Sequence, residues 1–148
     1  MKKILFLVII ILSTTLICPI GHTFAQKEKY QFVIEESYYK VNPENEDEFL
    51  EIHKKKIFPF WKEVEKMDLI DGEIKMYTQR IHTLKPSWTY KTVVRFKNYN
   101  AIDQWLEKRE EIINKLFPEE GGYNAIRKKV MAITEEHWDE LIKEIPLE

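Results

Sequence analysis

His53 is a candidate for ligand binding or proton transfer, because an imidazole can exchange a proton near neutral pH. It lies in the stretch FLEIHKKKIFPFWKEV, residues 49–64, where apolar side chains recur at three- and four-residue spacing. That spacing places the histidine on the apolar face of a predicted helix. Two interpretations follow. Either the ring is a core residue satisfied by a backbone carbonyl or a strand side chain, or it faces a cleft between helix and sheet.

Two adjacent carboxylates, Glu35 and Glu36, lie in a predicted first strand. Successive strand side chains point to opposite faces, so the two groups cannot act as one dyad. One of them should point toward the apolar side or into a barrel, where it needs a cation such as Lys75, Lys91 or Arg95. The functional alternative for that carboxylate is a general base with a raised pKa.

The histidines do not predict a metal site. No two of them stand at the spacing H-x-x-x-H, and His82 is expected in a polar hairpin loop. A site built from His53, His137 and Glu36 would need a contact that only the fold could supply. The sequence also lacks G-x-S-x-G, G-x-x-x-x-G-K and H-E-x-x-H, so the chemistry of those motifs is not expected.

Aromatic residues make up 13% of the chain. One interpretation is a large core together with a dimer interface. The other is an aromatic-lined pocket between helices and sheet, suited to a small, flat apolar ligand. The residues predicted to line that pocket are His53, Trp61, Met76, Tyr90 and Trp105.

The first 26 residues read MKKILFLVIIILSTTLICPIGHTFAQ, with two lysines before an apolar run and small residues near the end. This is the layout of a secretory signal peptide over residues 1–25, with cleavage after Ala25. A retained membrane anchor is the alternative, but the apolar stretch is shorter than a span needs. The mature chain is therefore expected in the periplasm or outside the cell, with no stable membrane span.

The only cysteine, Cys18, lies inside this leader, so the mature chain has neither a disulfide nor a thiolate. Removing Lys2 and Lys3 leaves 21 basic side chains against 25 acidic ones, a net charge near −4. This balance gives no electrostatic reason to expect nucleic acid as a partner. Residues 26–148 have the length of one ordinary domain.

The pattern after the leader predicts alternating strands and helices. A strand over 31–41 ends at Asn42-Pro43, where Asn caps a helix and Pro occupies its first turn. Pro59 should kink this helix near residues 55–58 or divide it in two. Alternation over 69–81 and 88–96 predicts a hairpin, with Trp88 and Tyr90 on the same face.

Asn100 is predicted to cap the next long helix, and residues 123–133 suit a third, short one. Residues 135–145 are ambiguous, because their apolar side chains keep helical spacing. We expect a strand there, since an order β-α-β-β-α-β needs a fourth strand. The predicted class is therefore α+β, ferredoxin-like, with an antiparallel sheet.

This order of elements resembles the ferredoxin-like dimeric α/β-barrel proteins over residues 30 to 146. Three local motifs carry the resemblance to small exported members: Asn42-Pro43, the aromatic-proline step Phe58-Pro59-Phe60-Trp61, and the segment Glu136-His137-Trp138. The resemblance implies a homodimer in which two sheets close one barrel. The polar face that would line it carries Glu73, Lys75, Tyr77, Lys91 and Arg95.

The superfamily includes cofactor-free monooxygenases, heme-degrading enzymes, stress-responsive proteins and many members without an assigned activity, and a fold does not choose among them. Our leading expectation is an exported homodimer that binds a small apolar ligand, with no cofactor. The alternative is a cofactor-free or heme-dependent monooxygenase that uses His53 and Trp61, although the spacing around them matches no heme-binding motif. A third possibility is a module whose exposed aromatics dock a protein partner.

Overall fold

The computed structural model describes residues 31–79, 87–145 and 147, so the predictions for the leader and for His82 lie outside the described part. The strands are β1 (Val33–Val41), β2 (Lys75–Thr78), β3 (Tyr90–Phe96) and β4 (Thr134–Lys143). The helices are α2 (Glu46–Ile52), α3 (Phe58–Lys66), α4 (Tyr99–Leu116) and α5 (Tyr123–Ala132). Three short turns complete the order: η1 (Pro43–Asn45), η2 (His53–Ile57) and η3 (Pro118–Glu120).

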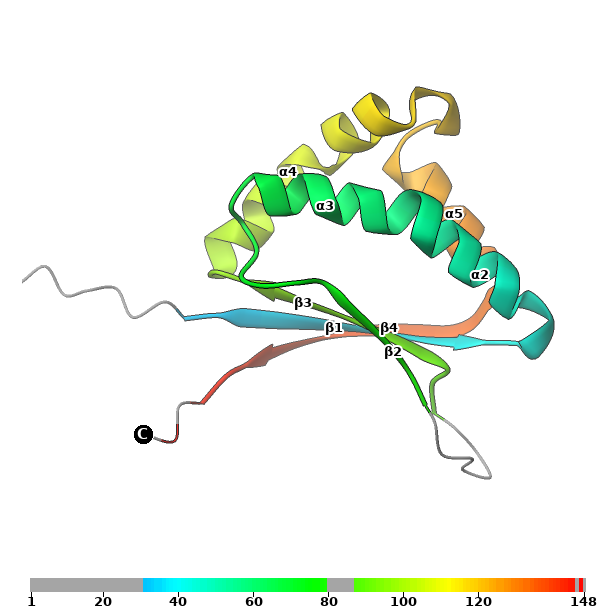
Figure 1. Cartoon of the computed structure of the whole chain (residues 1–148), viewed down its shortest axis with the longest axis horizontal. Coiled ribbons are helices and arrows are strands. Elements are labelled where there is room, and N and C mark those ends of the chain that lie inside the picture. The colour runs from blue at the N-terminus through cyan, green and yellow to red at the C-terminus, as the bar shows by residue number, and fades with distance from the viewer. Residues whose placement is uncertain (1–30, 80–86, 146, 148) are drawn as a thin grey trace, which may run out of the picture.

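The four strands form one antiparallel sheet in the order β2-β3-β1-β4, and the helices lie over one face of it (Figure 1). This is the predicted α+β ferredoxin-like fold. The last segment is a strand, as expected, although its apolar residues keep helical spacing. Pairing along β1 gives its backbone the hydrogen bonds that a helix would otherwise supply.

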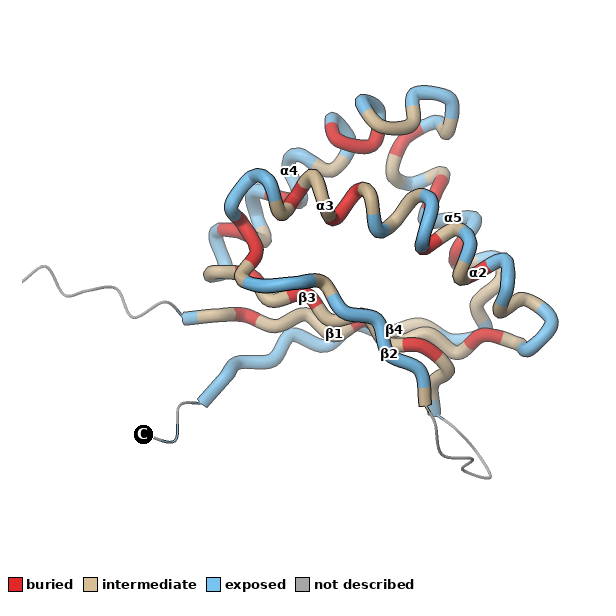
Figure 2. The backbone as a smooth tube through the Cα atoms, viewed as in Figure 1, coloured by how far each residue is buried: buried red, intermediate tan, exposed pale blue. Residues whose placement is uncertain are grey.

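The two faces of the sheet differ in what covers them. Along β1, alternate residues point to the helices, and the buried ones are Val33, Ser37 and Val41. No helix of the described ranges covers the opposite, outer face, and the tube in Figure 2 is mostly tan and pale blue along β2 and β4. The core therefore lies entirely between the helices and one sheet face.

The helical segment after β1 changes its winding before Pro59. Residues of η2 form a π-helical turn, in which the N–H of Phe58 donates to the carbonyl of His53. A proline at the first turn of α3 needs no N–H partner, and the wider turn avoids the clash that an α-helix would cause.

Two local predictions were wrong. The cap of α4 is Asn98, whose Oδ1 accepts the N–H of Ala101 at 2.9 Å, so the helix begins two residues earlier than Asn100 implied. Trp88 precedes β3 and does not share the face of Tyr90, because its ring meets that of Tyr38 on the outer face, 5.9 Å between centroids.

The core is divided into two groups of buried residues. The larger joins α3, α4, α5 and β3 and contains Phe60, Trp61, Val64, Leu69, Ile70, Val94, Phe96, Ala101, Trp105, Ile112, Ile113 and Ile126. The smaller contains Val41, Phe49, Tyr90 and Val130. Between residues 31 and 147, no described helix combines the length and the apolar character needed to cross a membrane.

Candidate functional site

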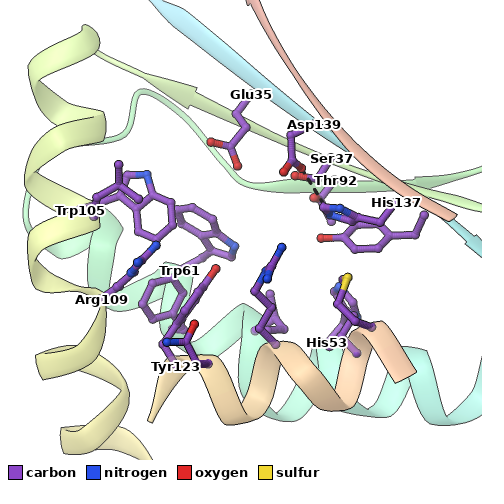
Figure 3. Close-up of a pocket in the computed structure, with 18 of the residues that line it drawn as sticks. Glu35, Ser37, His53, Trp61, Thr92, Trp105, Arg109, Tyr123, His137 and Asp139 are labelled. Carbon is purple, nitrogen blue, oxygen red and sulfur yellow. Dashed lines mark ion pairs between the residues drawn. The ribbon is translucent and has the colours of Figure 1, made fainter. Parts of the chain in front are cut away.

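A pocket of about 440 Å³ lies between the helices and the inner face of the sheet (Figure 3). Its sheet wall comes from β1, β3 and β4, and its helical wall from η2, α3, α4 and α5. Members of both core groups line it, Phe60, Trp61 and Trp105 from the larger and Val130 from the smaller. The pocket therefore lies between the two groups of buried core residues.

One side of the pocket is aromatic. The indole rings of Trp61 and Trp105 lie 5.2 Å apart between centroids, and Tyr123 lies 6.1 Å from Trp105. Trp105 is 5% exposed, and its Nε1 has no hydrogen-bond partner among the described residues. A buried donor without an acceptor is rare, so a ligand oxygen would satisfy a group that the protein leaves open.

His53 lies at the other side of the pocket and is only 4% exposed. Its Nδ1 donates to the carbonyl of Phe49 at 2.9 Å, so the neutral ring keeps its free lone pair on Nε2. Burial lowers the pKa of His53 to about 4, against the effect of that hydrogen bond. At neutral pH the ring is an uncharged hydrogen-bond acceptor.

His137 and Asp139 reach the same pocket from β4. The Nε2 of His137 lies 3.4 Å from Oδ1 of Asp139, and its ring lies 4.6 Å from that of Tyr39. Burial lowers the pKa of His137, although the carboxylate of Asp139 opposes that shift. The neighbouring Trp138 points to the outer face, so alternation along β4 separates the two residues.

Glu35 is the carboxyl group that faces the pocket, whereas Glu36 faces outward. Nζ of Lys91 donates to Oε1 of Glu36 at 2.9 Å, as the expected cation would. Glu35 has no ion pair with any residue in the described ranges. Burial, reinforced by the charge of Asp139, raises the pKa of Glu35 to about 7. A group with this pKa can give or take a proton at neutral pH.

The helical wall carries two cations opposite these carboxylates. Arg109 from α4 and Arg127 from α5 both line the pocket, and within the described residues neither forms an ion pair. The guanidinium of Arg109 lies over the ring of Tyr123, 5.1 Å from its centroid. In Figure 3, Arg109 and Tyr123 point from the helices toward Glu35 on the sheet.

The structure brings three of the five predicted pocket residues together: His53, Trp61 and Trp105. Tyr90 lies outside, because it packs in the smaller core group and its hydroxyl donates to Glu46 at 2.8 Å. Met76 also lies outside. Its strand β2 is at the edge of the sheet, two strands from the pocket's centre, and its side chain is 38% exposed.

Several pocket residues were not predicted, namely Ser37, Tyr39, Thr92, Arg109, Tyr123, Arg127 and Asp139. Alternation alone could have found Ser37 and Tyr39, which share a strand face with Glu35. The arginines gave no signal, because a single cation on an amphipathic helix normally faces solvent. Only the packing of α4 and α5 over the sheet brings them to the cavity.

The described residues do not fit heme as they stand. The ring of His53 lies 4.1 Å from that of Phe49 and 5.4 Å from that of Tyr39, centroid to centroid. A porphyrin would need these rings to move away from the imidazole. No group of three or more His, Cys, Asp or Glu side chains suited to a metal ion occurs among the residues described.

The sequence matches no protein-family model and no curated protein. The fold is similar to that of a dimeric ferredoxin-like protein from an uncultured marine organism, at 8% identity and a TM-score of 0.54, covering 80% of this chain and 90% of that one. A NIPSNAP family protein from Agrobacterium tumefaciens has 11% identity and a TM-score of 0.53, covering 80% and 90%.

A further similar structure is a conserved protein of unknown function from Bacteroides thetaiotaomicron, described as a possible oxidoreductase. It has 8% identity and a TM-score of 0.51, and the match covers 78% of this chain and 99% of that one. Identities this low show the fold alone. The comparisons thus show that the chain has a ferredoxin-like fold.

Proposed function

We propose that this chain is an exported homodimer that binds a small, largely apolar ligand in the pocket between its helices and its sheet. The observation that carries the proposal is the pocket itself, which has a volume of about 440 Å³ and lies between the helices and the sheet. Such a volume is in the range of small-molecule sites, whereas packing voids in protein interiors rarely exceed a water molecule.

The lining indicates the kind of ligand. Trp61 and Trp105 offer flat surfaces to an apolar ring, and the unpartnered Nε1 of Trp105 offers a donor to one oxygen. Ser37 and Thr92 add hydroxyl groups from the sheet. The ligand is therefore a flat apolar molecule that carries a small number of oxygen atoms.

The outer face of the sheet supports the homodimer. Tyr38 stacks on Trp138 with 4.9 Å between ring centroids, and Tyr77 on β2 is 44% exposed. Glu36 and Lys91 form an ion pair between these rings. A half-buried aromatic face with a charge pair is suited to a second copy of the same sheet. Of the two similar structures from Agrobacterium tumefaciens and the uncultured marine organism, the second is described as dimeric, which supports the proposal of a dimer.

Export is proposed from the leader alone, since residues 1–25 have the charge and hydropathy layout of a signal peptide. Edman or mass analysis of the protein recovered from the producing cells should give Gln26 as its first residue. A chain that keeps residues 1–25 would contradict export by cleavage.

Binding is tested with a filled pocket and a matched control. Thr92→Phe places a ring in the cavity, whereas Val93→Phe places the same ring on the outer face one residue further along β3. We expect a flat fluorescent probe such as anilinonaphthalene sulfonate to bind the unchanged protein and Val93→Phe, and to lose affinity for Thr92→Phe. Equal affinity for all three proteins would contradict the pocket as the binding site.

A second candidate is an enzyme, because Glu35, a carboxyl group with a raised pKa, lies in the same cavity. Shifted pKa values gather at catalytic sites, although ion-pair networks also produce them. Turnover by the purified protein of a compound that it binds would favour this candidate over binding alone.

A further inference from the structure

We propose that Glu35 is a general base that removes a proton from a carbon atom of a flat, unsaturated carbonyl compound bound in the pocket. This inference rests on the proposed binding function and adds a reaction to it. It also narrows the ligand to compounds that can lose such a proton.

Glu35 lies where a bound ligand could reach its carboxyl group. Its side chain leaves β1 on the face of Ser37 and Tyr39 and points into the cavity rather than to solvent (Figure 3). A structural carboxylate at such a depth normally has a cation, as Glu36 has Lys91 on the other face. Glu35 has no cation as a partner among the described residues, so no ion pair stabilises its charged form.

The charged and titratable groups around Glu35 come from every wall of the pocket. Asp139 and His137 lie on β4, His53 on η2, Arg109 on α4, and Tyr123 and Arg127 on α5. Asp139 disfavours a second negative charge, whereas the hydrogen bond with the side chain of Ser37 favours the charged form of Glu35. Burial also raises the pKa of Tyr123, so this phenol stays neutral. Glu35 is therefore the group of this set whose pKa, about 7, suits proton exchange at neutral pH.

The pocket also holds donors for the oxygen that becomes negative. When a proton leaves a carbon next to a carbonyl, the charge moves to the carbonyl oxygen, where positioned donors stabilise it. Among the described residues, the buried Nε1 of Trp105 has no hydrogen-bond partner and Arg109 forms no ion pair. Both line the same side of the cavity in Figure 3.

The step balances without a cofactor. The carboxylate of Glu35 forms an O–H bond as the C–H bond breaks, and the C–H electron pair becomes a C=C bond. The carbonyl π pair moves to oxygen and gives an enolate. Return of the proton from Glu35 to another carbon of the conjugated system yields an isomer and restores the carboxylate.

The experiment uses 5-nitrobenzisoxazole as a flat probe of base strength. A base removes its one ring C–H proton beside nitrogen, the C–H pair forms a nitrile, and the N–O bond breaks to give a coloured phenolate. We expect the unchanged protein to catalyse this reaction with a rate that rises with pH through about 7. Glu35→Gln should lose about 10²-fold of the rate.

Binding is followed separately, by quenching of tryptophan fluorescence with the cyanonitrophenol product. The control Glu107→Gln changes an exposed carboxylate of α4 outside the pocket and should keep the full rate. If both glutamine variants bind the product and keep the rate, Glu35 is not the base, although the pocket stands. If the unchanged protein does not bind the product, the binding function fails together with this inference.

Discussion

At the scale of single residues, the surroundings of two carboxyl groups and one imidazole decide the pKa of each. Glu36 has a lysine partner and a lowered pKa, because the hydrogen bonds from Tyr38 and Lys91 outweigh its partial burial. Glu35, one residue away, has burial without a cation and a raised pKa. His53 is held neutral by the same burial. One pocket is thus lined both by a protonatable carboxyl group and by an uncharged imidazole.

The buried imidazole predicts a dependence of stability on pH. The pKa of His53 is about 4 in the fold and 6.5 for an ordinary histidine. Below pH 6.5 the unfolded chain therefore takes up a proton that the folded chain refuses, and stability is lost as the pH falls toward 4. Between pH 7 and pH 4, we expect the free energy of unfolding of the unchanged protein to fall by about 3 kcal/mol more than that of His53→Asn.

Urea unfolding at pH 7, 5 and 4 measures this difference. Glu35 contributes with the opposite sign, since its neutral form is favoured at low pH, so the comparison must be between the two proteins rather than within one. Lys54→Ala, an exposed neighbour of His53, serves as the control and should follow the unchanged protein. Parallel curves for His53→Asn and the unchanged protein would show that His53 is not buried as described.

The sequence could predict that Glu35 and Glu36 face opposite ways, but not which of them faces the helices. Both faces of β1 carry an aromatic residue at the next positions, Tyr38 outward and Tyr39 inward. Apolar character therefore did not distinguish the faces. The pairing of β1 with the neighbouring strands decides the faces, and it brings Lys91 beside the outward-facing Glu36.

At the scale of elements, β4 shows how tertiary pairing decides between two local patterns. Trp138, Leu141 and Ile142 fit helical spacing, yet they belong to a ten-residue strand. Pairing with β1 gives a partner to every residue of β4 except Glu135, from Lys143 opposite Val33 to Thr134 opposite Val41. Periodicity indicated a helix for this segment. The need of the fold for a fourth strand predicted its structure correctly.

The turn before α5 predicts a difference between two adjacent glycines. Gly122 has φ 91° and ψ 177°, a conformation open essentially to glycine alone, whereas Gly121 has the left-handed helical φ 80° and ψ 27°. A Cβ at Gly122 would also lie 2.8 Å from a carboxylate oxygen of Glu110. We expect Gly122→Ala to lower the free energy of unfolding by about 2 to 3 kcal/mol and Gly121→Ala by about 1.

Chemical denaturation of the two variants provides the measurement. The turn positions Tyr123 and α5 at the pocket, so Gly122→Ala should also weaken probe binding more than Gly121→Ala does. Equal losses of stability in the two variants would mean that the turn does not have the described conformation.

At the scale of the whole molecule, the described helices all lie on one face of the sheet, and the other face is the one that we propose as the dimer interface (Figure 1). Trp138→Lys would place a charge in the centre of the aromatic outer face, against Tyr38. We expect this variant to be monomeric in light scattering at micromolar concentration, because an unpaired charge disfavours a buried contact.

Tyr99→Lys is the matched control for dimerisation. Tyr99 is 57% exposed and belongs to α4, on the helical side of the molecule. This variant should remain dimeric together with the unchanged protein. An unchanged protein that is monomeric, or a dimer that survives Trp138→Lys, would contradict the outer face as the interface.

Fold class could be predicted from the order of elements, whereas the composition of the pocket could be predicted only in part. Trp61 and Trp105 lie on helix stripes that must face a core, so periodicity placed them. Arg109 and Asp139 come from elements that are distant in sequence and meet only through packing. A single sequence contains no signal for such a meeting.

The most direct test of the central claim is native mass spectrometry of the protein purified from the cells that produce it, compared with the same sample after denaturation. We expect a dimer whose mass exceeds two chains by a small molecule that denaturation releases, and less of that molecule in Thr92→Phe. A protein without any releasable molecule, which also fails to bind flat probes added to it, would show that the pocket is not a ligand site.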